Sequence, residues 1–356
     1  MKTKILHSVF EKEISMKFFR TFLITACLLF AGLIHAQIGG AQLNKSGTTA
    51  AQFLKIGVGP RAIGMGGAFT ALADDINSMY WNPAGLAKMY SREAYFNHVD
   101  WISDVNLDYA GFAMDISGFG TLGTFVSIMS MGDMMIRTLE QPEGTGELFT
   151  AGAVVIGLSY ARNLTEEFAI GFNAKYINEY IWNENAIGFA FDIGTIYTIP
   201  FLNQFRLAAS ISNFGPKMRL SGRDILVVTT VGAGEGNVIN TDLQLEEFEL
   251  PLLFRIGFAV DAIKETEHRL TFAVDAVHPN DNSEYVNSGL EYTWNEIFFV
   301  RGGYKSLFEK DGEQGLTLGV GINYRLIESI KVKLDYAYED FGRLKNVQYI
   351  SLGLRF

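Results

Sequence analysis

Apolar and polar residues alternate one by one along many segments of the chain. In residues 316–324 (LTLGVGINY), every second side chain is apolar or aromatic, and the side chains between them are small or polar. Side chains of a β-strand point alternately to its two faces, so such a segment has one hydrophobic face and one small or polar face. The same period recurs in residues 168–176, 252–260, 270–275 and 331–336. We therefore expect an all-β protein.

The alternating segments are long for strands. They run about ten to fifteen residues, whereas strands of soluble proteins usually have about five or six and a tilted membrane-spanning strand needs roughly 9–11. Aromatic residues gather near their ends, for example Tyr180 and Trp182, and Tyr292 and Trp294. Such rings are typical of the two aromatic girdles of a membrane barrel. A soluble β-sandwich, which also alternates, is the less favoured alternative.

The links between the expected strands alternate in length. Every second link is a short turn, such as residues 117–118 and 295–296, whereas the others are longer, above all residues 131–147 and 215–245. Outer-membrane barrels show this asymmetry, with short periplasmic turns and long outer loops. Because lipid offers no partner to a free strand edge, the strands have to close into a barrel. We place about fourteen strands at residues 90–98, 105–116, 119–130, 148–162, 166–180, 186–199, 205–214, 246–262, 267–278, 284–294, 297–306, 314–325, 329–338 and 346–356.

The N-terminal residues have the features of a secretory signal. A basic stretch after Met16 precedes an apolar run of about fourteen residues, 21–34, and then the small residue Ala36. We expect a cleaved signal peptide at residues 1–36 with Met16 as the true start. The run is shorter than the ~20 residues of a spanning helix, so an uncleaved anchor is less favoured. Cleavage would remove the only cysteine, Cys27, which suits an envelope protein that does not rely on disulfides.

The C-terminal end of the chain indicates the location of the protein. Residues 350–356 alternate and finish on Phe356, which resembles the C-terminal signal that the barrel assembly machinery recognises. We therefore expect a multi-pass protein of the bacterial outer membrane, with outer-membrane lipid and that machinery among its partners. The formal net charge of −10, which loss of the basic signal makes more negative, argues against nucleic acid.

An enzyme is also considered and not favoured. His98 lies beside Asp100 near the end of the first expected strand, but residues two apart on a strand do not make a catalytic triad, and no nucleophile elbow is visible. After residue 36 the histidines are His98, His268 and His278, and their spacing matches no metal site. We expect no enzyme activity, no cofactor and no metal.

A glycine-rich stretch near the N-terminus breaks the alternation. It is no dinucleotide loop, because Phe69 stands where the third glycine belongs, and no Gly-Lys-Ser/Thr follows for a phosphate loop. Clustered glycines let backbone segments pack closely, and we expect Asp74 and Asp75 to cap a short helix that ends before Asn82-Pro83. We predict that residues 37–89 form a compact hatch, or plug, in the lumen of a barrel.

This stretch closely resembles one family of outer-membrane proteins. Residues 59–71 (GPRAIGMGGAFTA), 73–75 (ADD) and 80–86 (YWNPAGL) match the PorV/PorQ family, which shares the FadL-like barrel fold. The sharp resemblance covers about 40 residues. In FadL-like barrels the N-terminal segment is a hatch in the lumen, so the resemblance implies a hatch at residues 37–89 and a barrel at residues 90–356. It yields the candidate hatch or gating residues Asp74, Asp75, Asn82, Pro83 and Ala84.

Charged residues recur among the side chains expected on the inner face. A barrel lumen is wet and tolerates charge, so we expect these residues to pair with each other or with the hatch. The candidate lumen-lining residues are Lys175, Arg255, Asp275, Lys331, Lys333 and Asp335.

The resemblance implies two functions. The favoured one is type IX protein secretion, in which such barrels bind or attach cargo with a C-terminal sorting domain at the cell surface, together with other secretion-system subunits. The alternative is a FadL-like diffusion channel for hydrophobic small molecules. The long links at residues 131–147 and 215–245 suit either.

Overall fold

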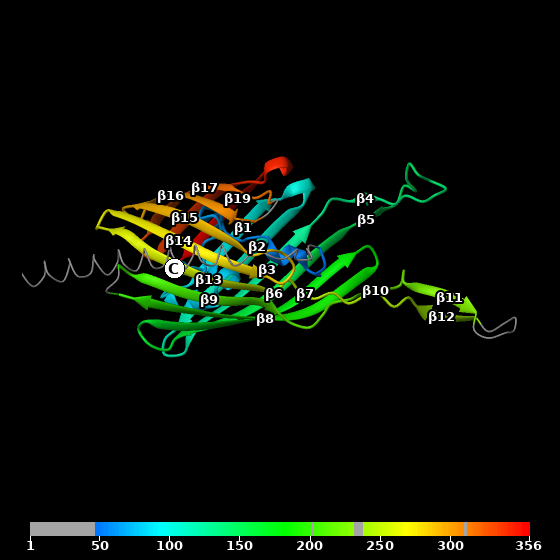
Figure 1. Cartoon of the computed structure of the whole chain (residues 1–356), viewed down its shortest axis with the longest axis horizontal. Coiled ribbons are helices and arrows are strands. Elements are labelled where there is room, and N and C mark those ends of the chain that lie inside the picture. The colour runs from blue at the N-terminus through cyan, green and yellow to red at the C-terminus, as the bar shows by residue number, and fades with distance from the viewer. Residues whose placement is uncertain (1–46, 201–202, 231–237, 310–311) are drawn as a thin grey trace, which may run out of the picture. The chain divides into compact units, whose positions relative to one another are not determined.

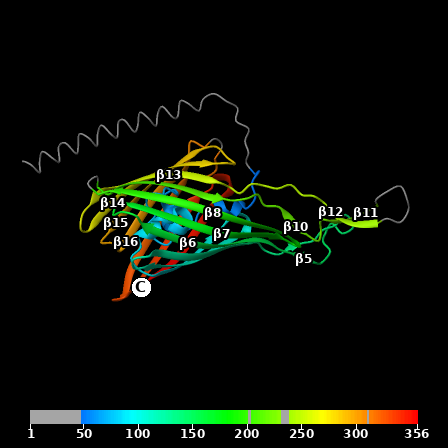
Figure 2. The same ribbon diagram turned by 90° about the horizontal axis from the view of Figure 1, so that it is seen from below.

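The chain folds as a closed antiparallel β-barrel of fourteen strands (Figures 1 and 2). The computed structural model describes residues 47–200, 203–230, 238–309 and 312–356, which all lie in the unit Lys45–Phe356. The expected signal peptide, with Met16 and Cys27, falls outside the described residues, as does the expected hatch up to residue 46.

Each barrel strand pairs antiparallel with the barrel strand next to it in the chain, and the last pairs with the first. Contacts between β19 and β1 and between β8 and β9 leave no free edge in the ring of described strands. The predicted barrel and its strand number are therefore confirmed. The strands are β1 (Glu93–Asp100), β2 (Asn106–Ile116), β3 (Gly120–Ser130), β6 (Ala151–Asn163), β7 (Phe168–Ile181), β8 (Glu184–Ile199), β9 (Phe205–Phe214), β13 (Leu253–Lys264), β14 (His268–Pro279), β15 (Tyr285–Trp294), β16 (Phe298–Leu307), β17 (Leu316–Ile327), β18 (Ile330–Asp340) and β19 (Asn346–Arg355).

Five shorter strands lie between the barrel strands at the two longest links. We expected loops there, except at residues 148–149, which fall within the strand expected at 148–162. In the β3–β6 link, β4 (Met134–Met135) pairs with β5 (Leu148–Phe149). In the β9–β13 link, β10 (Leu220–Gly222) extends the sheet beside β8, and β11 (Leu226–Thr230) pairs with β12 (Val238–Asp242). Figures 1 and 2 show both hairpins at the same end of the barrel, which we call the long-loop end; the other is the short-turn end.

One link departs from the expected asymmetry. The β7–β8 link belongs to the long-loop end, yet it consists only of Trp182 and Asn183. Trp182 adopts φ 52°, a left-handed conformation that is costly for a bulky residue. Further along the long-loop end, short 3₁₀ turns occupy η3 (Ile102–Asp104) and η4 (Gly342–Leu344).

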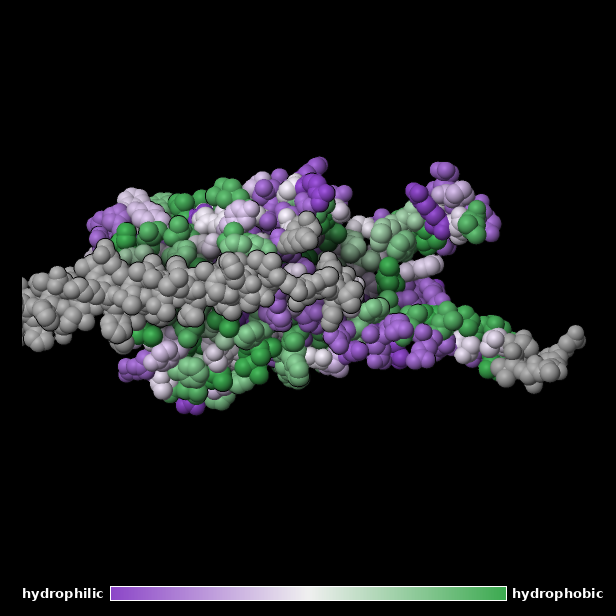
Figure 3. All heavy atoms as spheres, viewed as in Figure 1, coloured by the Kyte–Doolittle hydropathy of each residue, from purple (hydrophilic) through white to green (hydrophobic). Residues whose placement is uncertain are grey.

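Burial alternates along the strands as the sequence pattern predicts. On β17, Thr317 is fully buried, whereas Leu318 and Val320 are about half exposed. Figure 3 shows hydrophobic side chains over the barrel strands on the face in view, and an apolar outer band is what lipid contact requires. Within the described ranges, no helix combines the length and the apolar character needed to cross a membrane.

The hatch lies inside the ring of strands (Figure 1). It contains η1 (Gln52–Lys55), α2 (Pro60–Gly64), α3 (Ser78–Trp81) and η2 (Pro83–Lys88), and its large apolar side chains are buried. The hydrophobic core of the protein therefore lies between the hatch and the inner face of the barrel.

The predicted helix cap was wrong in its position. The residue before α3 is Asn77, and neither aspartate occupies that cap. Asp75 instead accepts a hydrogen bond from the backbone N–H of Asn77, at 3.0 Å, and stands two residues before the cap position. Asn82 is the residue that caps, because its Oδ1 accepts the N–H of Ala84 at the start of η2.

Candidate functional site

The described part of the hatch begins at the long-loop end, where Asp281 holds it. Asp281 Oδ2 accepts hydrogen bonds from Thr49 Oγ1 and from Lys55 Nζ, each at 2.8 Å. The backbone N–H of Ala50 donates to the carbonyl of Glu249 at 2.9 Å. The segment around η1 is thus tied to two different long-loop links.

A small apolar pocket lies beneath this segment. Its cavity volume is about 20 Å³, roughly the space of one water. The rings of Tyr109 and Phe125 stack there with centroids 5.6 Å apart. Its one charged residue, Lys175, is neutralised by Asp192 at 2.7 Å. The apolar side chains that line the pocket are Phe53, Leu54, Ile56, Val58, Met79, Tyr80, Tyr109, Phe125 and Val155.

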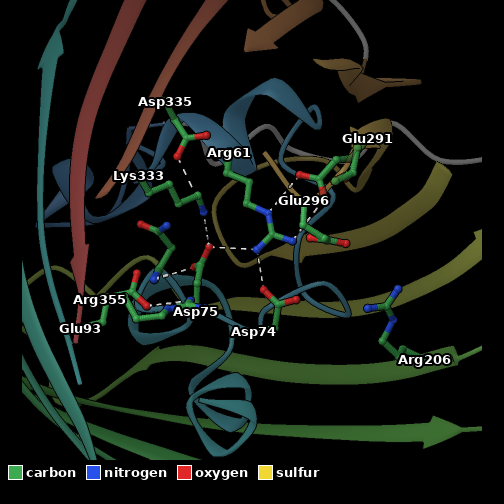
Figure 4. Close-up of polar contacts among 12 residues, drawn as sticks. Arg61, Asp74, Asp75, Glu93, Arg206, Glu291, Glu296, Lys333, Asp335 and Arg355 are labelled. Atoms are coloured by element: carbon green, nitrogen blue, oxygen red, sulfur yellow. Dashed lines mark hydrogen bonds and ion pairs between the residues drawn. The ribbon is translucent and has the colours of Figure 1, made fainter. Parts of the chain in front are cut away.

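A buried chain of ion pairs fastens the middle of the hatch to the wall (Figure 4). Arg61 of α2 contacts Asp74 and Asp75 of the hatch and also Glu291 of β15, whose Oε2 lies 3.1 Å from Arg61 Nε. The same carboxylate oxygen accepts a hydrogen bond from Arg301 of β16 at 2.7 Å. Charge-assisted hydrogen bonds of this kind are the strong ones, so these contacts hold α2 against the wall.

The chain of ion pairs continues onto β18. Arg301 donates to Asp335 at 2.6 Å, and Lys333 lies 3.7 Å from Asp335 and 3.2 Å from Asp75. The network therefore returns to the hatch and closes a loop through β15, β16 and β18. Its side chains are mostly buried, so each charge depends on its partners rather than on water.

Asp75 gives this network a predictable pH dependence. Burial alone would raise the pKa of Asp75, but the charges of Lys333 and Arg61 outweigh burial and hold it well below its ordinary value. The stabilisation is present above the unfolded pKa of about 3.9 and is lost as the pH falls towards the folded value. We expect the difference in unfolding free energy between the wild type and Asp75→Asn to be constant from pH 7 to 5 and to shrink below pH 4. Denaturant titrations at each pH measure it, and a difference that grows on acidification would contradict the assignment.

Two further wall residues contact the hatch, one at its backbone and one at a side chain. Asp275 of β14 accepts the N–H groups of Phe69 and Thr70, each at 2.9 Å. Arg255 of β13 donates to Ser212 at 3.0 Å, and its guanidinium lies 5.5 Å from the centre of the Trp81 ring.

The Asn-Pro-Ala segment meets the opposite wall. Asn82 Nδ2 donates to the carbonyls of Thr70, at 2.9 Å, and of Thr195 on β8, at 3.2 Å. Pro83 and its junction with Ala84 pack on Gly171 of β7, where an added Cβ would lie 2.3 Å from the Pro83 carbonyl carbon. The segment is therefore fixed between the hatch and the wall.

At the short-turn end the hatch faces two polar hollows. One has a volume of about 260 Å³ and lies beside Arg61, Asp75 and Lys331. The other has a volume of about 450 Å³ and includes Arg206. The two hollows share Asp74 and Lys88. In this form of the protein, the buried centre of the hatch separates them from the apolar pocket.

The structure brings four of the eleven candidate residues, among them Asp74, into one ion-pair network. Asp75, Lys333 and Asp335 belong to the ion-pair network, whereas Arg255 and Asp275 support the hatch separately. The sequence pattern alone did not single out Glu291, Arg301, Asp192 or Asp281 as site residues. Glu291 and Arg301 stand at inner positions of alternating strands, so extending the two-residue period to residues 291 and 301 would have found them.

The histidine considered for catalysis lies on the outer face. His98 Nδ1 is 2.7 Å from Asp108 and its Nε2 is 3.2 Å from Asp100. These contacts join polar groups at the long-loop end of β1 and β2 and include no nucleophile. Among the described residues, no group of three or more histidine, cysteine or acidic side chains is arranged to hold a metal.

Comparisons with known proteins agree with the fold. The sequence model of an uncharacterised protein family, UPF0164, matches residues 31–217, just over half of the chain. No curated protein matches the sequence.

Three solved structures similar to this chain are transport proteins. The toluene transporter TodX of Pseudomonas putida has 10% identity and a TM-score of 0.54. The toluene transporter TbuX of Ralstonia pickettii has 12% identity and a TM-score of 0.53. The monoaromatic hydrocarbon channel CymD has 16% identity and a TM-score of 0.51. Each comparison covers 84% of this chain and 97% of the other. At identities this low, the structural similarity shows a shared fold and nothing about shared function.

Proposed function

The chain belongs to the uncharacterised protein family UPF0164, and we propose that it is an outer-membrane channel for small hydrophobic molecules. The observation that carries the proposal is the apolar pocket between η1 and the wall strands β2, β3 and β6. Binding sites for small apolar molecules are concave and lined mainly by hydrophobic and aromatic side chains. The similarity of fold to toluene transporters and a hydrocarbon channel supports the same class of molecule.

The filled lumen supports a selective channel rather than an open pore. The hatch side chains Ile63, Met65 and Phe69 are fully buried inside the ring, so ions and sugars have no wide aqueous route. A pocket of about 20 Å³ is too small for a molecule such as toluene. Passage therefore requires a displacement of the hatch, and the segment around η1 is the part that roofs the pocket.

Uptake of toluene tests the proposal. Cells that express the protein should accumulate labelled toluene faster than cells with an empty vector, and Phe125→Gln should lower that gain about tenfold, because the change removes roughly 1.4 kcal/mol or more of apolar contact. Phe119→Gln is the matched control, since Phe119 is half exposed in the β2–β3 turn, outside the pocket. Toluene uptake equal to that of the empty vector would overturn the proposal.

A second candidate function is the type IX secretion predicted from the resemblance to the PorV/PorQ family. The observation in its favour is the pair of hairpins at the long-loop end. Val228 of β11 and Val238 of β12 are 71% and 59% exposed, and Met135 and Leu148 of the other hairpin are also exposed. Exposed apolar side chains on projecting strands suit a protein partner such as a sorting-domain cargo or another secretion-system subunit.

Deleting the gene separates the two candidates. Loss of toluene uptake with normal secretion of sorting-domain proteins favours the channel. Normal uptake with sorting-domain proteins retained in the periplasm favours secretion.

Cell fractionation tests the proposed placement in the outer membrane. A variant that lacks Phe356 tests recognition by the barrel assembly machinery, and normal assembly of that variant would argue against it.

A further inference from the structure

The short-turn end of the barrel carries a row of opposed cations. In the strand register, Arg325 of β17 faces Lys331 of β18, and Lys331 faces Arg355 of β19. Residues directly opposite on adjacent antiparallel strands have Cβ atoms about 4.5–5.5 Å apart, and like charges in such pairs repel. Three cations in adjacent positions are therefore unfavourable unless negative charge lies among them.

The carboxylates nearby do not neutralise this row. Glu93, opposite Arg355 in the register, lies 3.0 Å from it and thus serves one of the three cations. Across the parts of the chain that the structure describes, neither Arg325 nor Lys331 has an ion-pair partner. At least two positive charges in the row are left to solvent or to a ligand.

The smaller polar hollow adjoins this row and has a positive balance. Six cations line it, Arg61, Lys88, Arg269, Lys331, Lys333 and Arg355. Four carboxylates line it, Asp74, Asp75, Glu93 and Glu296. The lining alone thus has an excess of two positive charges in a protein whose net charge is −10. Glu291 and Asp335 also pair with Arg61 and Lys333, so Lys88 and Lys331 are the two lining cations without an ion-pair partner among the described residues. A cleft of one sign concentrates ions of the opposite sign.

The hollow has room for a ligand beside these cations. Gly353 of β19, which faces Lys333 in the register, lines it without a side chain of its own. Arg269 also lines the hollow; its Nη2 lies 3.3 Å from Glu296 Oε2, whereas its Nε is buried without a hydrogen-bond partner among the described residues. The volume of about 260 Å³ exceeds that of a small oxyanion several times.

We propose that this hollow is a binding site for a small oxyanion, a phosphate or a carboxylate, held chiefly by the unpaired Lys331 and assisted by Arg355 and Arg269, which also line the hollow. Lysine supplies a compact charge and arginine a planar fork that matches two oxygens of one anion. At the short-turn end, the site would meet molecules in the periplasm. It does not depend on passage of hydrophobic molecules, so the channel function and this site can fail independently.

Titration calorimetry on the full chain in detergent tests the site. Inorganic phosphate and acetate are titrated separately, and we expect saturable binding of at least one of them. Lys331→Gln should weaken that binding about tenfold, since it removes one charge-assisted contact. Lys217→Gln is the matched control, because Lys217 is exposed in the β9–β13 link at the other end of the barrel, and it should bind as the wild type does. Absence of saturable binding for both anions, or equal affinity in Lys331→Gln and the wild type, would overturn the proposal.

A second measurement needs no variant. Lysines of the wild-type protein are labelled with an amine-reactive reagent with and without saturating anion, and the labelled positions are read by peptide mass spectrometry. The anion should suppress labelling of Lys331 several-fold and leave Lys217 unchanged. Equal labelling of Lys331 in both conditions would count against the site even if a variant failed to fold.

Discussion

Replacing Arg301 by methionine should loosen the hatch and lower the unfolding free energy by about 3 kcal/mol or more. Arg301 is fully buried and contacts two carboxylates, Glu291 at 2.7 Å and Asp335 at 2.6 Å. Methionine fills a similar volume but leaves both carboxylates with fewer counter-charges, and an uncompensated buried charge is costly. Because Glu291 also binds Arg61 of the hatch, we expect the change to weaken the attachment of α2 to the wall. Denaturant titration in detergent measures the loss, and limited proteolysis reports release of the hatch.

An exposed arginine supplies the matched control for this prediction. Arg343 of η4 pairs with Glu313 but is 86% exposed, and exposed ion pairs contribute only about 0–1 kcal/mol. Arg343→Met should therefore unfold nearly as the wild type does. Equal denaturant midpoints for the two variants would show that the buried ion pairs do not fasten the hatch.

The barrel wall was predictable because its pattern is local. Every spanning strand turns one face to lipid and the other to the lumen. The period of two is therefore visible in each segment on its own. β17 was expected at residues 314–325 and runs Leu316–Ile327, and β8 was expected at 186–199 and runs Glu184–Ile199. The errors fall at the strand ends, where the pattern carries least information.

The contacts of the hatch were not predictable in the same way. Arg61 and Glu291 lie 230 positions apart, and the alternation places Glu291 on the inner face without saying which hatch residue it meets. Asp75 was expected as a helix cap and as a hatch residue, and its partner Lys333 as a residue of the inner strand face, but nothing in the sequence paired the two. Pairing across the lumen depends on how the ring closes, which no single segment encodes.

The hairpins of the long links were missed for a different reason. Residues 226–230 are rich in β-branched side chains and 238–242 contain three, but the links were identified by length and interpreted as loops. A two-stranded ribbon is only marginally stable by itself. The strands of this ribbon are short and pair only with each other, so the sequence shows no long alternation from which they could be predicted.

Replacing Gly303 by valine should unseat the hatch from β16. A Cβ at Gly303 would lie 2.2 Å from the backbone nitrogen of Gly66 and 2.4 Å from the carbonyl carbon of Met65. Both are backbone atoms, and Gly66 has φ +68°, so the hatch cannot yield by rotating a side chain. We expect a cost of about 3 kcal/mol, the upper end for overpacking, and ion currents in planar bilayers that the wild type does not show.

A variant at the neighbouring Gly302 distinguishes displacement of the hatch from a general weakening of β16. Gly302 points the other way, and a Cβ there would meet only Leu318, at 4.0 Å. Gly302→Val therefore adds the same side chain to the same strand on its outer face, where valine suits lipid, and should keep both the wild-type stability and the closed state. If the two variants conduct alike, contact between β16 and the hatch does not close the lumen. If Gly303→Val alone conducts, the close fit of Met65 and Gly66 to the wall is what seals the barrel.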